Sequence, residues 1–317
     1  MLKQFLSDDY LYTYGWHSDE ESLCQLEMRA FFDFDAEINV LFSNQRISPS
    51  RSPFMKERLQ IIYRGKTVDE IVEQVKNLSI GEDTFKVISM NHYQISSIEK
   101  FKLKERQKVM KKVGLAINGV PDLDNPTHRF GLVFIDGIWY FGLYEKNEPV
   151  WHYHMKKPQS YSTALSTKLA RALVNIAVPQ TKDVRVIDPC CGIGTVLVEA
   201  LSMGINIIGR DRNPLVTMGS RENIRHFGYK GDVILGPIAD INEKYDVAII
   251  DLPYNLYTHI TDDEILDIIK QARRIAEKVV FVTIEPIDSM LKQAGFSIID
   301  RGVAKKSQFI REVIVVE

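Results

Sequence analysis

The chain has 317 residues, of which 45% are hydrophobic and 26% charged, so it can bury sizeable cores in two domains or three small ones. No apolar run approaches the roughly 20 residues of a membrane-spanning helix, and acidic residues interrupt the N-terminus too early for a secretory signal. Three cysteines are too few for a disulfide framework or a four-ligand zinc site, so we expect a cytoplasmic protein without a metal centre. Because the formal net charge is −2, any nucleic-acid contact must come from local basic patches.

Residues 1–80 alternate short strands with helices, which predicts a small α+β domain. Each predicted helix has apolar residues three and four apart, and therefore one face to bury. The expected elements are strands at 10–14 and 39–42, helices over 20–32 and 68–78, and a loop over 47–53.

Residues 81–150 predict a second α+β domain, in which an Asp136-Gly137 turn joins two strands of a hairpin. The expected elements are a strand at 84–90, a long helix over 97–118, and the hairpin strands 130–135 and 138–144. The helix carries four lysines on a face distinct from its apolar residues: Lys104, Lys108, Lys111 and Lys112. Such a face is either simply solvated or a contact for phosphates, and the pattern alone leaves both readings open.

Residues 151–165 read as a linker that is rich in polar residues, Pro and His. Lys156 and Lys157 give its start a basic character and join the candidate RNA contacts. His152 and His154 lie two apart, but no acidic residue or cysteine is nearby, so we expect no metal site there.

From residue 166 to 317 the regular alternation of strands and helices predicts a doubly wound, Rossmann-like α/β sheet. The expected strands are 184–187, 205–209, 233–235, 245–251, 279–284, 296–300 and 313–316. No helix separates the last two strands, so they should pair as an antiparallel hairpin. A seven-stranded sheet with a reversed final strand resembles the architecture of class I methyltransferases.

The turn Asp188-Pro-Cys-Cys-Gly-Ile-Gly-Thr195 joins a predicted strand to a helix. Its two glycines match the first half of G-x-G-x-x-G, but Leu197 stands where the third glycine should be, which argues against a nicotinamide enzyme. The turn resembles D-P-x-C-G-x-G-T, the S-adenosylmethionine loop of amino-methyltransferases. Glycines let the backbone approach the ligand, and the following helix offers N–H groups to its carboxylate. The resemblance implies cofactor contacts at Asp188, Cys190, Gly192, Gly194 and Thr195.

Two further acids are candidate cofactor ligands. Asp211 lies about 20 residues past the loop at the tip of the next predicted strand, where a carboxylate can bind both ribose hydroxyls. Asp240 occupies the position where this fold usually contacts the adenine amine, although an aspartate in a loop is common.

The strand 245–251 ends in Asp251-Leu252-Pro253-Tyr254, which resembles the (D/N)-P-P-(Y/F/W) signature of methyltransferases that act on exocyclic amines of nucleobases. Such an amine is a poor nucleophile until acceptors hold its hydrogens. A carboxylate and a main-chain carbonyl are acceptors only. We expect Asp251 and the Leu252 carbonyl to bind the amine, Pro253 to stiffen the turn and Tyr254 to stack on the base.

The order of strand, basic helix, hairpin and basic exit resembles the THUMP RNA-binding domain, and this implies that residues 1–80 are the ferredoxin-like domain that often precedes it. With the approach Lys156 to Leu173 and the Asp251 turn, residues 84–317 resemble THUMP-containing RNA guanine-N2 methyltransferases. The resemblance implies methylation of tRNA guanosine at position ten. This sequence has Leu252 where the family's motif has its first Pro. Residue 252 therefore loses the φ angle that a proline ring fixes, but it keeps the main-chain carbonyl that can accept a hydrogen bond.

Several alternatives remain open. The same signature serves ribosomal RNA guanine-N2 and adenine-N6 methyltransferases. A non-catalytic RNA-binding protein with a degenerate methyltransferase domain is an alternative of another class, supported only by Leu252.

Overall fold

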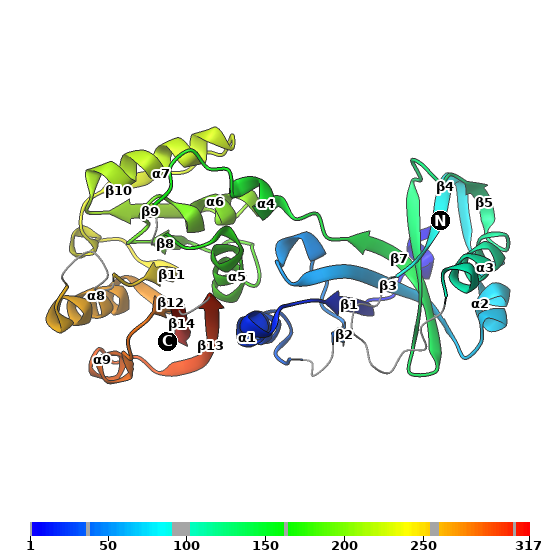
Figure 1. Cartoon of the computed structure of the whole chain (residues 1–317), viewed down its shortest axis with the longest axis horizontal. Helices are drawn as coiled ribbons and strands as arrows, with labels where there is room; N and C mark the ends of the chain where they lie inside the picture. The colour runs from blue at the N-terminus through cyan, green and yellow to red at the C-terminus, as the bar shows by residue number, and fades with distance from the viewer. Residues whose placement is uncertain (1, 36–38, 91–101, 162–163, 254–259, 307–308) are drawn as a thin grey trace. The chain divides into compact units, whose positions relative to one another are not determined.

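The computed structural model describes residues 2–35, 39–90, 102–161, 164–253, 260–306 and 309–317. The chain forms two compact units, each with its own seven-stranded sheet (Figure 1). The first unit contains residues 1–15, 36–50 and 54–148, and the second contains residues 16–35, 51–53 and 149–317. None of the helices in the described part of the chain has the length and apolar character of a bilayer span.

The sheet of the first unit has the strand order β2-β1-β3-β7-β6-β4-β5. In chain order its strands are β1 (Tyr10–Tyr14), β2 (Val40–Ser43), β3 (Met55–Gly65), β4 (Ser79–Ser89), β5 (Asn118–Pro121), β6 (His128–Ile135) and β7 (Ile138–Lys146). The helices α2 (Val68–Val75) and α3 (Leu103–Gly114) share one apolar core with this sheet. Strands from both sides of residue 80 lie in the same sheet, so no boundary between compact units falls there.

The predicted hairpin is confirmed, because β6 and β7 pair antiparallel from Phe130↔Leu143 to Ile135↔Ile138. Asp136 and Gly137 have φ values of 49° and 79°, the left-handed pair that a two-residue turn of this type requires. The basic helix α3 ends at Gly114 rather than at residue 118, where β5 begins. Its predicted start at residues 97–101 lies outside the described residues.

The central strand β3 is missing from the sequence prediction because polar residues interrupt its apolar pattern. Glu57 and Arg58 are both buried in it. Glu57 accepts a hydrogen bond from the Tyr144 hydroxyl at 2.7 Å, and Arg58 donates to Glu145 at 2.5 Å. These partners stand on β7, the neighbouring strand, and satisfy groups whose burial would otherwise be costly.

The sheet of the second unit has the order β10-β9-β8-β11-β12-β14-β13. Its strands are β8 (Val186–Asp188), β9 (Ile207–Asp211), β10 (Val233–Leu235), β11 (Tyr245–Asp251), β12 (Ala276–Thr283), β13 (Ile298–Lys306) and β14 (Phe309–Val316). β14 runs antiparallel to both β12 and β13, whereas the other pairs are parallel. This confirms the predicted α/β fold with a reversed last strand.

The helices of the second unit alternate with these strands, as expected from the sequence. They are α5 (Thr167–Ala177), α6 (Thr195–Ser202), α7 (Pro214–His226), α8 (Asp262–Ile275) and α9 (Asp288–Gln293). The Ser166 hydroxyl accepts the Leu169 N–H and so caps the start of α5. A short helix α4 (Val150–His154) occupies part of the predicted linker.

The second unit also contains α1 (Glu21–Phe32), which the sequence analysis assigned to the N-terminal domain. Glu27 of this helix is fully buried, accepts a hydrogen bond from Asn175 of α5 at 2.7 Å and another from Ser52. Arg29 pairs with Asp300 of β13 at 2.7 Å. These contacts join segments that lie far apart in the chain, which explains why a local pattern assigns α1 to the wrong unit.

His154 is buried at the end of α4 and is held by neighbouring side chains. Its Nδ1 lies 2.7 Å from Glu199 Oε1 and its Nε2 lies 3.0 Å from the Tyr229 hydroxyl. Glu199 is also fully buried and pairs with Arg171 at 2.8 Å. The histidine therefore anchors α4 within the second unit. Among the described residues, no group of acids, histidines and cysteines is arranged to hold a metal.

Candidate active site

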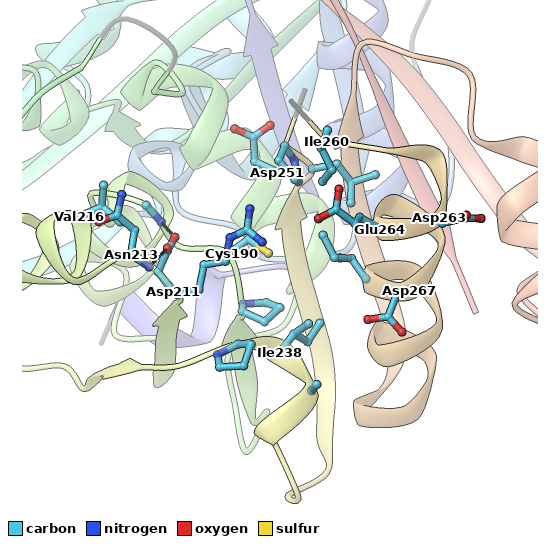
Figure 2. A pocket seen from close by; sticks show the side chains of 18 of the residues that line it. Cys190, Asp211, Asn213, Val216, Ile238, Asp251, Ile260, Asp263, Glu264 and Asp267 are labelled. Carbon is cyan, nitrogen blue, oxygen red and sulfur yellow. Dashed lines mark hydrogen bonds between the residues drawn. The ribbon is translucent and has the colours of Figure 1, made fainter. Parts of the chain in front are cut away.

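A cavity of about 790 Å³ opens at the carboxyl ends of β8, β9 and β11, the edge where ligands bind in open α/β sheets. Figure 2 shows Asp251 at the end of its strand, Asp211 across the cavity, and Glu264 and Asp267 on the helix at the other side. The two predicted ligand acids therefore face the same space, although they stand on different strands. All lining residues belong to the second unit.

The glycine loop follows β8 and requires its two glycines. Gly192 and Gly194 have φ values of 51° and 75°, which favour glycine. A Cβ at Gly194 would lie 2.2 Å from the Ser220 hydroxyl, and one at Gly192 would lie 2.6 Å from the Tyr161 hydroxyl. Gly194 is the N-cap of α6, so this helix begins directly behind the loop.

Asp211 ties the loop to the end of β9. Its Oδ2 accepts the Gly192 N–H and its Oδ1 accepts the Asn213 N–H, both at 2.9 Å. A carboxylate has about four lone-pair positions, so two remain for ligand hydroxyls on the cavity side. The side chain lines the cavity, where the sequence analysis expected the ribose ligand.

The other predicted loop residues divide into one that lines the cavity and three that support the loop. Cys190 lines the cavity, and burial raises the pKa of its thiol, so it stays protonated. Asp188 is buried behind the loop and accepts the Cys190 N–H at 3.2 Å. Burial raises the pKa of Asp188 well above its usual range, and the nearby carboxylates of Asp211 and Asp251 add to this rise. Gly194 and Thr195 do not line the cavity either.

Asp240 does not line the cavity. Its side chain is 62% exposed and lies 3.6 Å from Arg210. The preceding residues Pro237, Ile238 and Ala239 form the wall instead. The role of Asp240 as an adenine contact therefore stays a prediction, and the residues just before it are the ones that line the cavity.

Asp251 combines burial with an unused acceptor. It is half-buried and lines the cavity, and its Oδ1 is shielded from solvent without a hydrogen-bond partner among the described residues. Burial raises the pKa of Asp251 to about 7, and the positive charge of Arg311 opposes the rise. A buried acceptor without a partner is costly unless a ligand supplies a donor.

The residues after Asp251 continue the turn into the cavity wall. Leu252 is 2% exposed and belongs to the apolar core, and both Leu252 and Pro253 line the cavity. The N–H of Leu252 donates to the Val282 carbonyl at 2.9 Å, which extends the pairing of β11 with β12 by one residue. Tyr254, the predicted stacking residue, lies outside the described residues.

One acidic wall of the cavity is absent from the predicted site residues. Asp263, Glu264 and Asp267 stand on the first turns of α8 and line it. Their spacing of one and four residues is a helical signal that could have indicated a shared face. It was hidden because Thr261 and Glu264 also form a capping box, which explains acidic residues at a helix start without a ligand.

The candidate RNA-binding lysines lie on two units and differ in surroundings. Lys104, Lys108 and Lys111 are exposed on α3 of the first unit, whereas Lys112 of the same helix pairs with Asp69. In the second unit Lys156 is exposed and Lys157 is half-buried, so burial lowers the pKa of Lys157. Among these six candidate lysines, the positive charge available to a partner therefore comes chiefly from α3.

Comparison with known proteins bears on the second unit. Residues 155–282 match the family model UPF0020, described as an RMKL-like methyltransferase domain. This segment is similar to a methyltransferase domain. Its cofactor is S-adenosylmethionine, as the glycine loop indicated.

Three curated relatives carry one name, tRNA (guanine(10)-N2)-dimethyltransferase. The protein of Methanothermobacter thermautotrophicus is 38% identical over 104 residues, which are 32% of this chain and 31% of that protein. The protein of Methanocaldococcus jannaschii is 24% identical over 249 residues, 66% of this chain and 69% of that one. The first alignment thus spans about a third of the relative's length. Among solved structures, TrmN from Thermus thermophilus has 17% identity and a TM-score of 0.48, with 98% of this chain and 99% of that chain covered.

Proposed function

We propose that this protein is an S-adenosylmethionine-dependent RNA methyltransferase that methylates the exocyclic N2 of a guanosine in tRNA. The observation that supports the proposal is that Asp211 and Asp251 line one cavity. The Oδ1 of Asp251 is buried there and has no hydrogen-bond partner among the described residues. Position ten of the tRNA is the specific target suggested by the names of the relatives.

The residues of the cavity fit the proposed cofactor. Gly192 and Gly194 adopt left-handed backbone conformations and have no side chain, so a ligand can come close to the backbone of the loop. Asp211 retains acceptor capacity for ribose hydroxyls, and the wall of Pro237, Ile238 and Ala239 offers an apolar surface for the adenine. The remaining acids suit a ligand whose sulfonium and ammonium groups are positive.

Bound S-adenosylmethionine would supply an electrophilic methyl group on sulfur, and the C–S electron pair would stay with the sulfur as the N–C bond formed. Asp251 Oδ1 and the Leu252 carbonyl hold the two hydrogens of the amine, which frees its lone pair for attack. Asp251, when ionised, accepts the excess proton or passes it to water. Alignment of two bound reactants supplies much of the acceleration, because it removes several kcal/mol of entropic cost.

The base must leave its stack to reach the cavity, and the protein must therefore hold the surrounding RNA. The exposed lysines of α3 are candidates for phosphate contacts, with Lys156 as a further one. We propose that the first unit acts as a THUMP-like RNA-binding region. Recognition of this kind reads the shape of the RNA rather than its sequence.

One alternative of another class is a non-catalytic RNA-binding protein. Leu252 was the reason to consider a degenerate, non-catalytic domain, yet its N–H is hydrogen-bonded and its carbonyl is retained. Leucine at this position is thus compatible with the amine-binding role. Adenine-N6 or ribosomal RNA methylation uses the same groups, and the product assay distinguishes them.

The decisive experiment uses the variant Asp251→Ala and the full-length protein with transfer RNA transcripts. We expect Asp251→Ala to lose methyl transfer by at least about 100-fold, while S-adenosylmethionine still binds. The methylated nucleoside is identified by mass spectrometry, which separates guanine N2 from adenine N6. Wild-type activity in the variant, or a wild-type protein that binds RNA but transfers no methyl group to any tested RNA, would contradict the proposal.

A further inference from the structure

Tyr161 is a cavity residue to which the sequence analysis assigned no role. It stands in the segment before α5, 43% exposed, and lines the same cavity as Gly192 and Asp211. Its hydroxyl lies 2.6 Å from the position that a Cβ on Gly192 would occupy. The ring therefore covers the glycine loop, and this close approach is a second reason for a glycine at position 192.

The segment that carries Tyr161 is fixed to the loop by one buried side chain. Asn223 of α7 is fully buried, and its amide donates both to the Gln159 carbonyl at 3.0 Å and to the Ile193 carbonyl at 2.9 Å. Its Oδ1 accepts the Gln159 N–H at 2.9 Å. Ile193 stands between the two loop glycines, so Asn223 holds both walls of this end of the cavity at a fixed separation.

The position of Tyr161 indicates which part of a ligand it would meet. Asp211 and the wall at residues 237–239 are on the ribose and adenine side of the proposed site, whereas Gly192 leads to the start of α6. A helix start attracts the carboxylate of a ligand, and a phenol hydroxyl can donate to the same group. The Tyr161 hydroxyl, beside Gly192, would suit the carboxylate of the ligand's amino-acid half.

We propose that Tyr161 forms the outer wall of the methyl-donor site and contacts the methionine half of S-adenosylmethionine, with Asn223 as the positioning residue that holds this wall against the glycine loop. The inference rests on the proposed function and deepens it by naming a binding residue outside the motifs. Tyr161 is an exposed side chain, so its replacement leaves the apolar core intact.

The test measures the dissociation constant of S-adenosylmethionine by isothermal titration calorimetry on the full chain. We expect Tyr161→Ala to weaken binding by about tenfold, and the matched control Tyr153→Ala, another exposed tyrosine of this unit outside the cavity, to stay within about twofold. Tyr161→Phe locates the contact: an equal loss assigns it to the hydroxyl, and a smaller loss assigns it to the ring. A Tyr161→Ala variant within twofold of wild type would overturn the proposal. Failure of the wild-type protein to bind would instead overturn the proposed function.

A double-mutant cycle tests the role of Asn223. We expect Asn223→Ala to weaken binding about fivefold in the wild-type background and less than about twofold when Tyr161 is already alanine, because it acts through Tyr161. A merely structural residue would give equal losses in both backgrounds, and that result would remove Asn223 from the proposal. Circular dichroism checks the fold of each variant, and the Tyr161 variants decide the main proposal even if Asn223→Ala does not fold.

Discussion

The N–H of Leu252 donates a hydrogen bond of 2.9 Å to the carbonyl of Val282 on the neighbouring strand. Proline has no N–H and cannot make this bond. The departure from a Pro-Pro turn at residue 252 therefore has a structural role, because it extends the β11–β12 pairing into the cavity wall. The strand end is stiffened by a hydrogen bond where the related signature relies on a fixed φ.

We predict that Leu252→Pro is less stable than Leu252→Ala, although proline keeps more apolar surface. Alanine loses buried side-chain packing but retains the N–H, whereas proline also leaves the Val282 carbonyl unpaired, at a cost of about 1–3 kcal/mol. Urea unfolding of both variants measures the difference in free energy. A proline variant as stable as the alanine variant would show that the bond contributes nothing.

We predict that Asp211→Ala and Asp240→Ala behave differently although both acids were candidates from the sequence. Asp211 holds the Gly192 N–H and lines the cavity, so its loss should weaken S-adenosylmethionine binding by about tenfold or more. Asp240 lies outside the lining, and its loss should change the dissociation constant by less than about twofold. Calorimetric titration compares the two, and a large effect at Asp240 would place the adenine contact on that side chain.

We predict that buried Glu27 makes stability fall as pH rises. Burial raises the pKa of Glu27 from 4.5 to about 7, so the folded state binds more protons than the unfolded state between these values. This difference in proton binding contributes on the order of 3 kcal/mol to the free energy of unfolding. The contribution is fully present below about pH 4.5 and is lost as the pH rises through about 7. Thermal unfolding between pH 5 and 8 should show a smaller decline for Glu27→Gln than for wild type. Parallel curves for the two proteins would contradict the assignment.

We predict that reversing the charge of Lys108 and Lys111 weakens tRNA binding in a salt-dependent manner. Both side chains are exposed on α3, and removal of each lysine–phosphate ion pair should lower the slope of log K against log salt by about one. Filter binding over a salt series measures this slope. Lys292→Glu, on α9 of the other unit, serves as the charge control. Unchanged affinity in the double variant would return α3 to a solvated face.

Local patterns determined much of the second unit. Short β-branched runs alternate with amphipathic segments along the chain, as the observed strands and helices do, and Asp211 and Asp251 are the last residues of their strands. Because parallel strands end at the same edge, their position in sequence was enough to predict that these acids share a cavity. The Asp136-Gly137 hairpin followed in the same way from the φ values that its turn requires.

Tertiary structure alone decided what depends on contacts between distant segments. Glu27 and Asn175 are 148 residues apart, and their hydrogen bond helps to hold α1 in the second unit. Strand β3 carries two buried charged residues, Glu57 and Arg58. Their burial is costly unless they are hydrogen-bonded, and their partners Tyr144 and Glu145 stand on another strand. Tyr161 reaches the cavity because Asn223 fixes its segment, and nothing in a polar linker indicates such a bond. The sequence by itself determined which elements form and where their ends carry chemistry. It did not determine which surfaces meet, because packing energy is set by side chains that no short window contains.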